Sequence, residues 1–261
     1  MNVIDSSKAL VDFLHFVSTQ KTHLSNWQFF HIKIEDPEKA LNIDEVEQFL
    51  YFHIDNDDAW LLKIYDAQEL LLFTNKNDSL ALSKFEKAAN ENFEGNVLRM
   101  QFRGFDGDGL EKFSSIIAPL ISADDVVTHV AFKRMRRLGN SILVLDDDPI
   151  IIKQMEKIVS GYGHIVTLEE VDNFFENYKE YAPDILFLDI HLKSARGNEI
   201  LKELKTKIDP YAYVVMISSD TQKEMVMDIK SGGANGFVVK PLSREKLFQQ
   251  IIKAPTITKK I

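Results

Sequence analysis

Cysteine is absent from the 261-residue sequence. Its absence excludes disulfide bonds and zinc sites built from thiolates. Long hydrophobic runs are absent as well, because stretches such as AWLLKIY (59–65) fall far short of the roughly 20 apolar residues that span a bilayer. The first ten residues also lack the basic and apolar regions of a secretion signal. We therefore expect a cytoplasmic protein with no membrane partner.

Acidic residues outnumber basic ones mainly in the N-terminal half. The net charge is −9 overall, and residues 1–132 alone carry 11 basic and 22 acidic side chains. Residues 138–261 are nearly balanced, with 16 basic and 18 acidic side chains. An acidic half repels a phosphate backbone, so nucleic acid is not expected as its partner.

From Asn140 onward, short apolar runs alternate with amphipathic stretches. Strands are predicted at residues 141–147, 164–170, 184–190, 211–219 and 236–241. Helices are predicted at residues 149–163, 172–183, 197–207, 222–233 and 243–253. Runs such as ILVL are apolar without alternation, which is typical of parallel strands covered on both faces. The pattern predicts an α/β fold, a doubly wound (βα)5 parallel sheet whose ligands bind at the carboxyl ends of the strands.

The N-terminal half predicts an α+β domain. Strands are predicted at residues 27–35, 59–65, 69–75 and 96–102. Helices are predicted at residues 6–24, 42–54, 79–93 and 109–121. From the first strand to the last, the order is β-α-β-β-α-β, which is the ferredoxin-like split unit.

These patterns divide the chain into four parts. The expected parts are an N-terminal output or adaptor domain over residues 1–121, a linker helix over 122–139, a C-terminal domain over 140–255 and a tail over 256–261. The last residues, APTITKKI, are expected to fray. The linker contains KRMRR (133–137), whose side chains we expect on the solvated face of the helix, with a nucleic-acid or phospholipid patch as the alternative.

Polar residues of complementary charge follow the predicted parallel strands. Asp146 and Asp147 end the first strand and Asp189 ends the third. Ser218 ends the fourth strand and Lys240 ends the fifth. Because the carboxyl ends of parallel strands meet at one edge of a sheet, these side chains are expected to meet in one cleft.

Three neighbouring carboxylates repel each other unless a cation lies between them. Magnesium binds through one or two carboxylates, waters and phosphate oxygens, so the pattern indicates Mg²⁺ and a phosphoryl group. Asp189 can act as a nucleophile that forms an aspartyl phosphate. Lys240 would then neutralise charge on the transferred oxygens, and Ser218 would hydrogen-bond one of them.

Residues 140–254 resemble the receiver domain of two-component response regulators, the CheY-like family. The matching motifs, in order, are ILVLDDDP, DILFLDIHLKSARG, VVMISSD and GGANGFVVKP. The resemblance implies a phosphoprotein of phosphorelay signal transduction in which Asp189 accepts phosphate from a histidine kinase. It implies Mg²⁺ bound by Asp146, Asp147, Asp189 and the backbone carbonyl of His191. It implies further that Ser218 and Phe237 are the switch residues and that Lys240 contacts the phosphoryl group.

Some positions depart from that family's pattern. Lys193 stands where proline is common, Ser218 replaces the commoner threonine, and Phe237 lacks a tyrosine hydroxyl. Asp148 is expected to be the N-cap of the next helix, with Pro149 at its first position, and not a metal ligand. The implied partners are a sensor histidine kinase or phosphotransfer protein, a downstream protein and a second copy of the chain through the receiver.

Residues 25–120 resemble a degenerate diguanylate cyclase (GGDEF-like) domain. The segment KIYDAQELLLF places Asp66, Ala67, Gln68, Glu69 and Leu70 at the signature turn of that family. Both turn glycines and one metal-binding acid are absent, so the resemblance implies that catalysis is lost. An unrelated ferredoxin-like module fits the same pattern. Glu35 and Asp36, at the end of the first strand, are weaker candidates for ligand binding.

The main hypothesis is a response regulator that is no enzyme beyond its own phosphorylation and dephosphorylation. One alternative makes the N-terminal domain an active nucleotide cyclase or cyclic-nucleotide enzyme. Another makes the protein a DNA-binding regulator that uses KRMRR. The acidic charge of residues 1–132 opposes the DNA-binding alternative.

Overall fold

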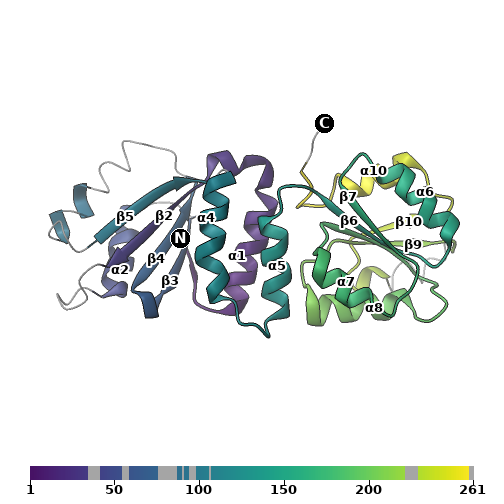
Figure 1. Ribbon diagram of the computed structural model, residues 1–261, viewed down its shortest axis with the longest axis horizontal. Helices are drawn as coiled ribbons and strands as arrows, with labels where there is room; N and C mark the ends of the chain where they lie inside the picture. Colours follow the sequence, from purple (N-terminus) through teal and green to yellow (C-terminus); the bar gives the residue numbers. More distant parts are fainter. Residues whose placement is uncertain are drawn as a thin grey trace. The chain divides into compact units, whose positions relative to one another are not determined.

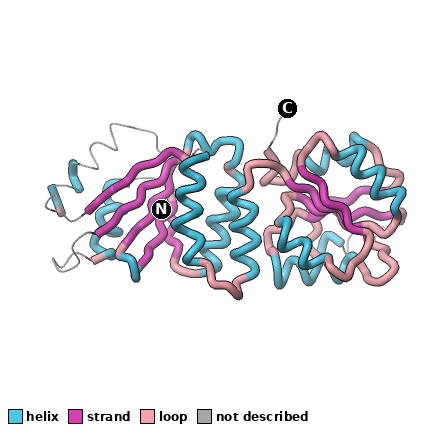
Figure 2. Tube along the Cα trace, viewed as in Figure 1, coloured by secondary structure: helices cyan, strands magenta, loops and turns pink. Residues whose placement is uncertain are grey.

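The computed structural model describes residues 1–34, 42–54, 59–75, 87–89, 91–93, 98–105, 107–220 and 229–258. The chain divides into two units, one of Met1–Phe13 and His23–Leu120 and the other of Leu14–Thr22 and Ile121–Ile261. Each unit contains one β-sheet with helices against it (Figures 1 and 2). Among the described residues, no helix has both the length and the hydropathy to cross a membrane.

The first unit contains a mixed five-stranded sheet of order β1-β3-β4-β2-β5. The strands are β1 (Asn2–Ile4), β2 (Gln28–Ile34), β3 (Trp60–Ile64), β4 (Glu69–Thr74) and β5 (Leu98–Gly104). β2 pairs antiparallel with β4 and β5, and β3 pairs antiparallel with β4. This order and pairing confirm the predicted split unit, while the short strand β1, which pairs parallel with β3, was not predicted.

Helices cover both faces of this sheet. The helices are α1 (Ser7–Thr19), α2 (Ile43–His53) and α4 (Gly107–Ile117). Alternate residues of β2 point to opposite faces, so Phe30 packs with the apolar side of α2. Phe29 lies on the other face, with its ring centroid 5.5 Å from that of Phe113 on α4. Asn42 begins α2 with a capping box that also involves Glu45.

Several predictions fall on residues that the structure does not describe. The helix predicted at 79–93 is described only at 87–89 and 91–93, and the helix predicted at 222–233 only from 229 onward. The candidate ligand residues Glu35 and Asp36 also lie outside the described residues.

The second unit contains a parallel five-stranded sheet of order β10-β9-β8-β6-β7. Its strands are β6 (Ser141–Leu145), β7 (His164–Leu168), β8 (Ile185–Asp189), β9 (Val214–Ser218) and β10 (Gly236–Val239). The first strand of this unit along the chain lies inside the sheet, between the second and third, so the helices fall on both faces. The predicted doubly wound sheet is confirmed.

Helices cover both faces of this parallel sheet (Figure 1), and an apolar layer lies on each face. The helices are α6 (Pro149–Val159) and α10 (Arg244–Ile251) on one face, and α7 (Phe174–Tyr181) and α8 (Gly197–Glu203) on the other. Ile142 and Val144 of β6 face the first layer, whereas Leu143 faces the second. Because both faces are buried, the strand is apolar throughout, which explains the uninterrupted ILVL run.

Short turns of other helical types connect these elements. Turns of 3-10 helix lie at Lys21–Asn26, Tyr65–Ala67 and Ala118–Leu120, and a π-helical turn lies at Leu204–Ile208.

The predicted linker contains helix α5 (Val126–Arg136), which is part of the core of the second unit. Val130 belongs to the apolar layer beneath α7 and α8. Arg134 is only 3% exposed, so the expectation that KRMRR forms a solvated face is wrong at this residue. Arg137 is also engaged, since it donates hydrogen bonds to Tyr181 O and to the Asp184 carboxylate. The run is therefore not a free basic patch.

Arg134 forms a buried network with Tyr178 and Asp209. Its guanidinium pairs with the Asp209 carboxylate, and its Nε donates to Pro183 O at 2.9 Å. The Tyr178 hydroxyl donates to Asp209 Oδ2 at 2.7 Å. Burial alone would raise the pKa of Asp209, but the Arg134 charge and these hydrogen bonds outweigh burial and lower it. A fully paired cluster of this kind tolerates burial, whereas a lone charge in the same place would not.

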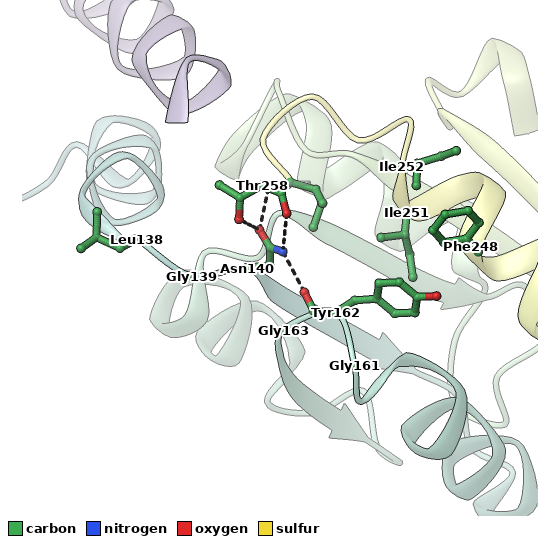
Figure 3. Close-up of a pocket in the computed structure, with 11 residues that line it drawn as sticks. Leu138, Gly139, Asn140, Gly161, Tyr162, Gly163, Phe248, Ile251, Ile252 and Thr258 are labelled. Atoms are coloured by element: carbon green, nitrogen blue, oxygen red, sulfur yellow. Dashed lines mark hydrogen bonds between the residues drawn. The ribbon is translucent and has the colours of Figure 1, made fainter. Parts of the chain in front are cut away.

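Residues 256–258 of the tail that was expected to fray pack against the second unit, and residues 259–261 lie outside the described residues. Thr256 and Ile257 are buried, at 4% and 7% exposure. Thr258 donates from its backbone nitrogen and its hydroxyl to Asn140 Oδ1, at 2.7 and 2.6 Å. Asn140 Nδ2 donates to Tyr162 O at 2.8 Å. The side-chain amide of Asn140, which directly precedes β6, thus binds both the tail and the loop after α6 (Figure 3). A cavity of about 660 Å³ beside this amide lies at the amino ends of the strands.

Replacing Arg134 by methionine leaves Asp209 as a buried charge without its counter-ion. We expect the free energy of unfolding to fall by about 3–5 kcal/mol, measured by urea denaturation followed by circular dichroism. Arg136→Met is the matched control, because Arg136 is an exposed residue of the same helix. The control should change stability by less than about 1 kcal/mol. Equal losses in the two variants would contradict the network.

The lowered pKa of Asp209 makes part of the stability depend on pH. A carboxyl whose folded-state pKa lies below its unfolded value of about 4 stabilises the fold above that pH. The contribution is lost as the pH falls through the folded-state pKa. Asp209→Asn should therefore be less stable than the wild type at neutral pH, and the gap should narrow below about pH 4. Urea denaturation across this range measures the gap, and a constant gap would contradict the assignment.

Candidate functional site

Five polar residues lie at the carboxyl ends of four parallel strands in the second unit. Asp146 and Asp147 directly follow β6, and Asp189 is the last residue of β8. Ser218 is the last residue of β9, and Lys240 directly follows β10. The fold thus brings together residues that are up to 94 positions apart along the chain.

The three carboxylates form one cluster. Each of Asp146, Asp147 and Asp189 offers an oxygen within 4.8 Å of those of the other two. Asp146 is fully buried and Asp189 is 3% exposed. Three negative charges so close repel each other, and burial removes the water that would screen them. The cluster therefore needs positive charge nearby.

Lys240 supplies part of that charge. Its Nζ lies 2.8 Å from Asp146 Oδ2 and 2.9 Å from Asp189 Oδ1. Burial works to lower the pKa of Lys240, but the hydrogen bonds with the two carboxylates outweigh it and raise the pKa. The pKa of Asp146 is raised, mainly by burial, although Lys240 opposes the shift. One ammonium therefore neutralises the two most buried carboxylates only in part.

Backbone amides fix the orientation of each carboxylate. Asp148 N donates to Asp146 Oδ1 at 3.0 Å, and His191 N donates to Asp189 Oδ2 at 2.9 Å. Asp147 Oδ2 accepts from Lys193 N at 2.7 Å. These bonds come from the loops after β6 and β8, so the loop backbone holds the acidic cluster in place.

The chemistry of this donor set fits a divalent cation. Magnesium takes carboxylate oxygens and keeps several waters. Asp146 Oδ2 is buried, and its partner is the Lys240 ammonium at 2.8 Å. Asp146, Asp147 and Asp189 can each offer one carboxylate oxygen to such a cation.

The remaining candidates are Ser218, Phe237 and His191. Ser218 is fully buried, and its Oγ accepts a hydrogen bond from Asp220 N at 2.9 Å. Phe237 on β10 is partly buried and packs against the apolar layer of α7 and α8. The side chain of His191 is exposed.

Asp148 caps helix α6, as predicted. Its carboxylate accepts from Ile150 N at 2.8 Å, and Pro149 occupies the first turn. Its side chain therefore satisfies a helix terminus, which separates its role from those of the two preceding aspartates.

Gly197 is a positioning residue to which the sequence assigned no role. A Cβ at this position would lie 2.3 Å from Asp189 O, closer than any real contact. Gly197 N also donates to Ile190 O at 3.0 Å. Helix α8 can therefore begin directly against the backbone of Asp189 only if residue 197 is glycine. The sequence signal that could have pointed to this role is the spacing of eight residues between Asp189 and Gly197.

The turn whose sequence was compared with a cyclase signature lies between β3 and β4. Gln68 has φ of 51°, the left-handed conformation that glycine adopts more easily. The Glu69 carboxylate contacts His31 Nε2 at 2.6 Å and also pairs with Lys33. Glu69 therefore already has two partners within the sheet.

The family match lies within the second unit. Residues 142–252 match the family described as the response regulator receiver domain. The chemotaxis protein CheY of Bacillus subtilis is 31% identical over 118 residues, which cover 44% of this chain and 98% of CheY. This half of the chain belongs to the response regulator receiver family.

Other relatives are matched over different fractions of their own length. The sensory transduction protein LytT of Enterococcus faecalis is 29% identical over 116 residues, which cover 43% of this chain and 47% of LytT. A solved complex of CheX and CheY from Borrelia burgdorferi with BeF3 and magnesium contains a chain that is 30% identical, with a TM-score of 0.41. The match covers 44% of the present chain and 87% of the chain in that complex. The chain is thus a CheY-like two-component response regulator, and the receiver family to which it belongs regulates and does not catalyse.

Proposed function

We propose that the receiver is switched by phosphorylation of Asp189. The observation that carries the proposal is the Lys240 ammonium, which bridges Asp189 and Asp146 at the edge of the sheet. Asp189 has one oxygen against this ammonium and the other against a backbone amide. A carboxylate held in this way is oriented for attack on an incoming phosphorus atom.

Magnesium would be held by oxygens of Asp146, Asp147 and Asp189 and by the backbone carbonyl of His191. When bound, it would neutralise charge on the phosphoryl oxygens and complete the set of positive charges that the cluster lacks.

The chemical step is phosphoryl transfer from a phosphohistidine of a sensor kinase or phosphotransfer protein. An Asp189 oxygen forms a bond to phosphorus as the bond to the histidine nitrogen breaks, so the histidine leaves as neutral imidazole after taking up a proton. Lys240 stabilises the negative charge on the transferred oxygens. The buried hydroxyl of Ser218 donates a hydrogen bond to one of them once it turns from its present partner.

The switch follows from that movement of Ser218. Its turn toward the phosphoryl group vacates space beside β10, into which the partly buried Phe237 rotates. The face of β10 and α10 then has a different shape for a downstream protein or a second receiver. The N-terminal unit serves as a non-catalytic output or adaptor domain whose contacts change with this state.

Asp189→Asn removes the oxygen nucleophile and one negative charge. We expect loss of Mg²⁺-dependent labelling by radioactive acetyl phosphate, because an amide oxygen does not form the acyl phosphate. Asp148→Asn is the matched control, since asparagine also caps helices and Asp148 is not a proposed ligand. The control should be labelled as strongly as the wild type. Undiminished labelling of Asp189→Asn would overturn the acceptor assignment.

The resemblance of the first unit to a cyclase gives a second test. We expect no cyclic dinucleotide or cyclic mononucleotide when the full chain is incubated with GTP or ATP and Mg²⁺ or Mn²⁺. The reason is that Gln68 replaces a metal-binding acid and Glu69 is already paired with His31 and Lys33. Chromatography of the nucleotides measures the outcome, and product formation that Glu69→Gln abolishes would support an active cyclase.

A further inference from the structure

Lys193 lies against the one carboxylate of the cluster that Lys240 does not neutralise. Its backbone amide donates to Asp147 Oδ2 at 2.7 Å. Its ammonium lies 3.3 Å from Asp147 O and 3.9 Å from Asp147 Oδ2. In the described part of the chain, no other basic side chain forms an ion pair with Asp147.

The backbone contact determines where the side chain of Lys193 begins. Because the amide is bonded to the Asp147 carboxylate, the backbone of residue 193 stays beside that carboxylate. A lysine at this position therefore keeps its ammonium within one side-chain length of the acidic cluster. The side chain is 82% exposed, so its ammonium is hydrated and is not locked in one geometry.

A positive charge beside Asp147 competes with any other cation for that carboxylate. Asp146 and Asp189 share the Lys240 ammonium, whereas Asp147 has only Lys193 among the basic side chains that the structure describes. A divalent cation at the cluster would have to displace the Lys193 ammonium or tolerate its repulsion. Either event weakens binding, and solvent exposure keeps the effect modest.

We infer that Lys193 lowers the affinity of the acidic cluster for divalent cations. The inference rests on the proposed Mg²⁺ site and deepens it. Lys193 raises the free Mg²⁺ concentration at which half of the protein is loaded. The amount of receiver that is ready for phosphorylation therefore follows the Mg²⁺ concentration over a higher range than the three carboxylates alone would give.

Calorimetric titration of the full chain with MgCl₂ tests this role without any phosphorylation. Lys193→Gln removes the charge and keeps the backbone amide, so the Kd for Mg²⁺ should fall about threefold at low salt. Lys193→Arg keeps a charge at the same place and should leave the Kd within about 1.5-fold of the wild type. Lys157→Gln is the control for net charge, because Lys157 is exposed in the last turn of α6, away from the strand ends that hold the cluster.

The salt dependence and the other possible results distinguish a failure of the role of Lys193 from a failure of the proposed Mg²⁺ site. The difference between wild type and Lys193→Gln should shrink as ionic strength rises. If the wild type binds Mg²⁺ and Lys193→Gln binds no more tightly, the role of Lys193 fails and the metal site stands. If Lys193→Arg or Lys157→Gln gains as much as Lys193→Gln, charge beside Asp147 is not the cause, and the inference also fails. If no protein binds Mg²⁺, both the site and the inference fail.

Discussion

The ammonium of Lys240 between Asp146 and Asp189 is the contact on which the receiver's site depends. It joins the ends of β6, β8 and β10, three strands of the same sheet, in one set of ion pairs. Without this charge, two buried carboxylates would face each other with no counter-ion. The parallel order of the strands makes the contact available, since only that order collects all three residues at one edge.

A second set of buried charges lies at the other end of the strands. Asp184 directly precedes β8 and Asp209 precedes β9, and each carboxylate receives an arginine from the segment that contains α5. The two ends differ in how completely they are paired. Arg134, Tyr178 and Asp209 satisfy one another, as a structural cluster should. The acidic cluster at the carboxyl ends has more negative than positive groups, an excess that the proposed Mg²⁺ would offset.

Sequence patterns predicted the receiver's sheet, and the meeting of its polar residues at one edge, because both follow from local rules. Unbroken apolar runs such as ILVL report strands that are buried on both faces, and polar residues after them report the edge where ligands bind. The role of Gly197 and the burial of Arg134 were not predictable in this way. They depend on how closely α8 approaches Asp189 and on which charge lies opposite Asp209, and neither is encoded in local periodicity. The strand β1 is only three residues long, too short for a periodic signal.

The burial of Arg134 also fixes where this receiver can be cut from the rest of the chain. The family match begins at Ile142, and the 118 matched residues of CheY cover 98% of that protein. A fragment of this chain that starts at Asn140 would lack α5 and would leave Asp209 and Tyr178 without their arginine. For genetic fusion or domain exchange, a fragment that keeps Asp209 paired with Arg134 has to include α5 and therefore begins before Val126.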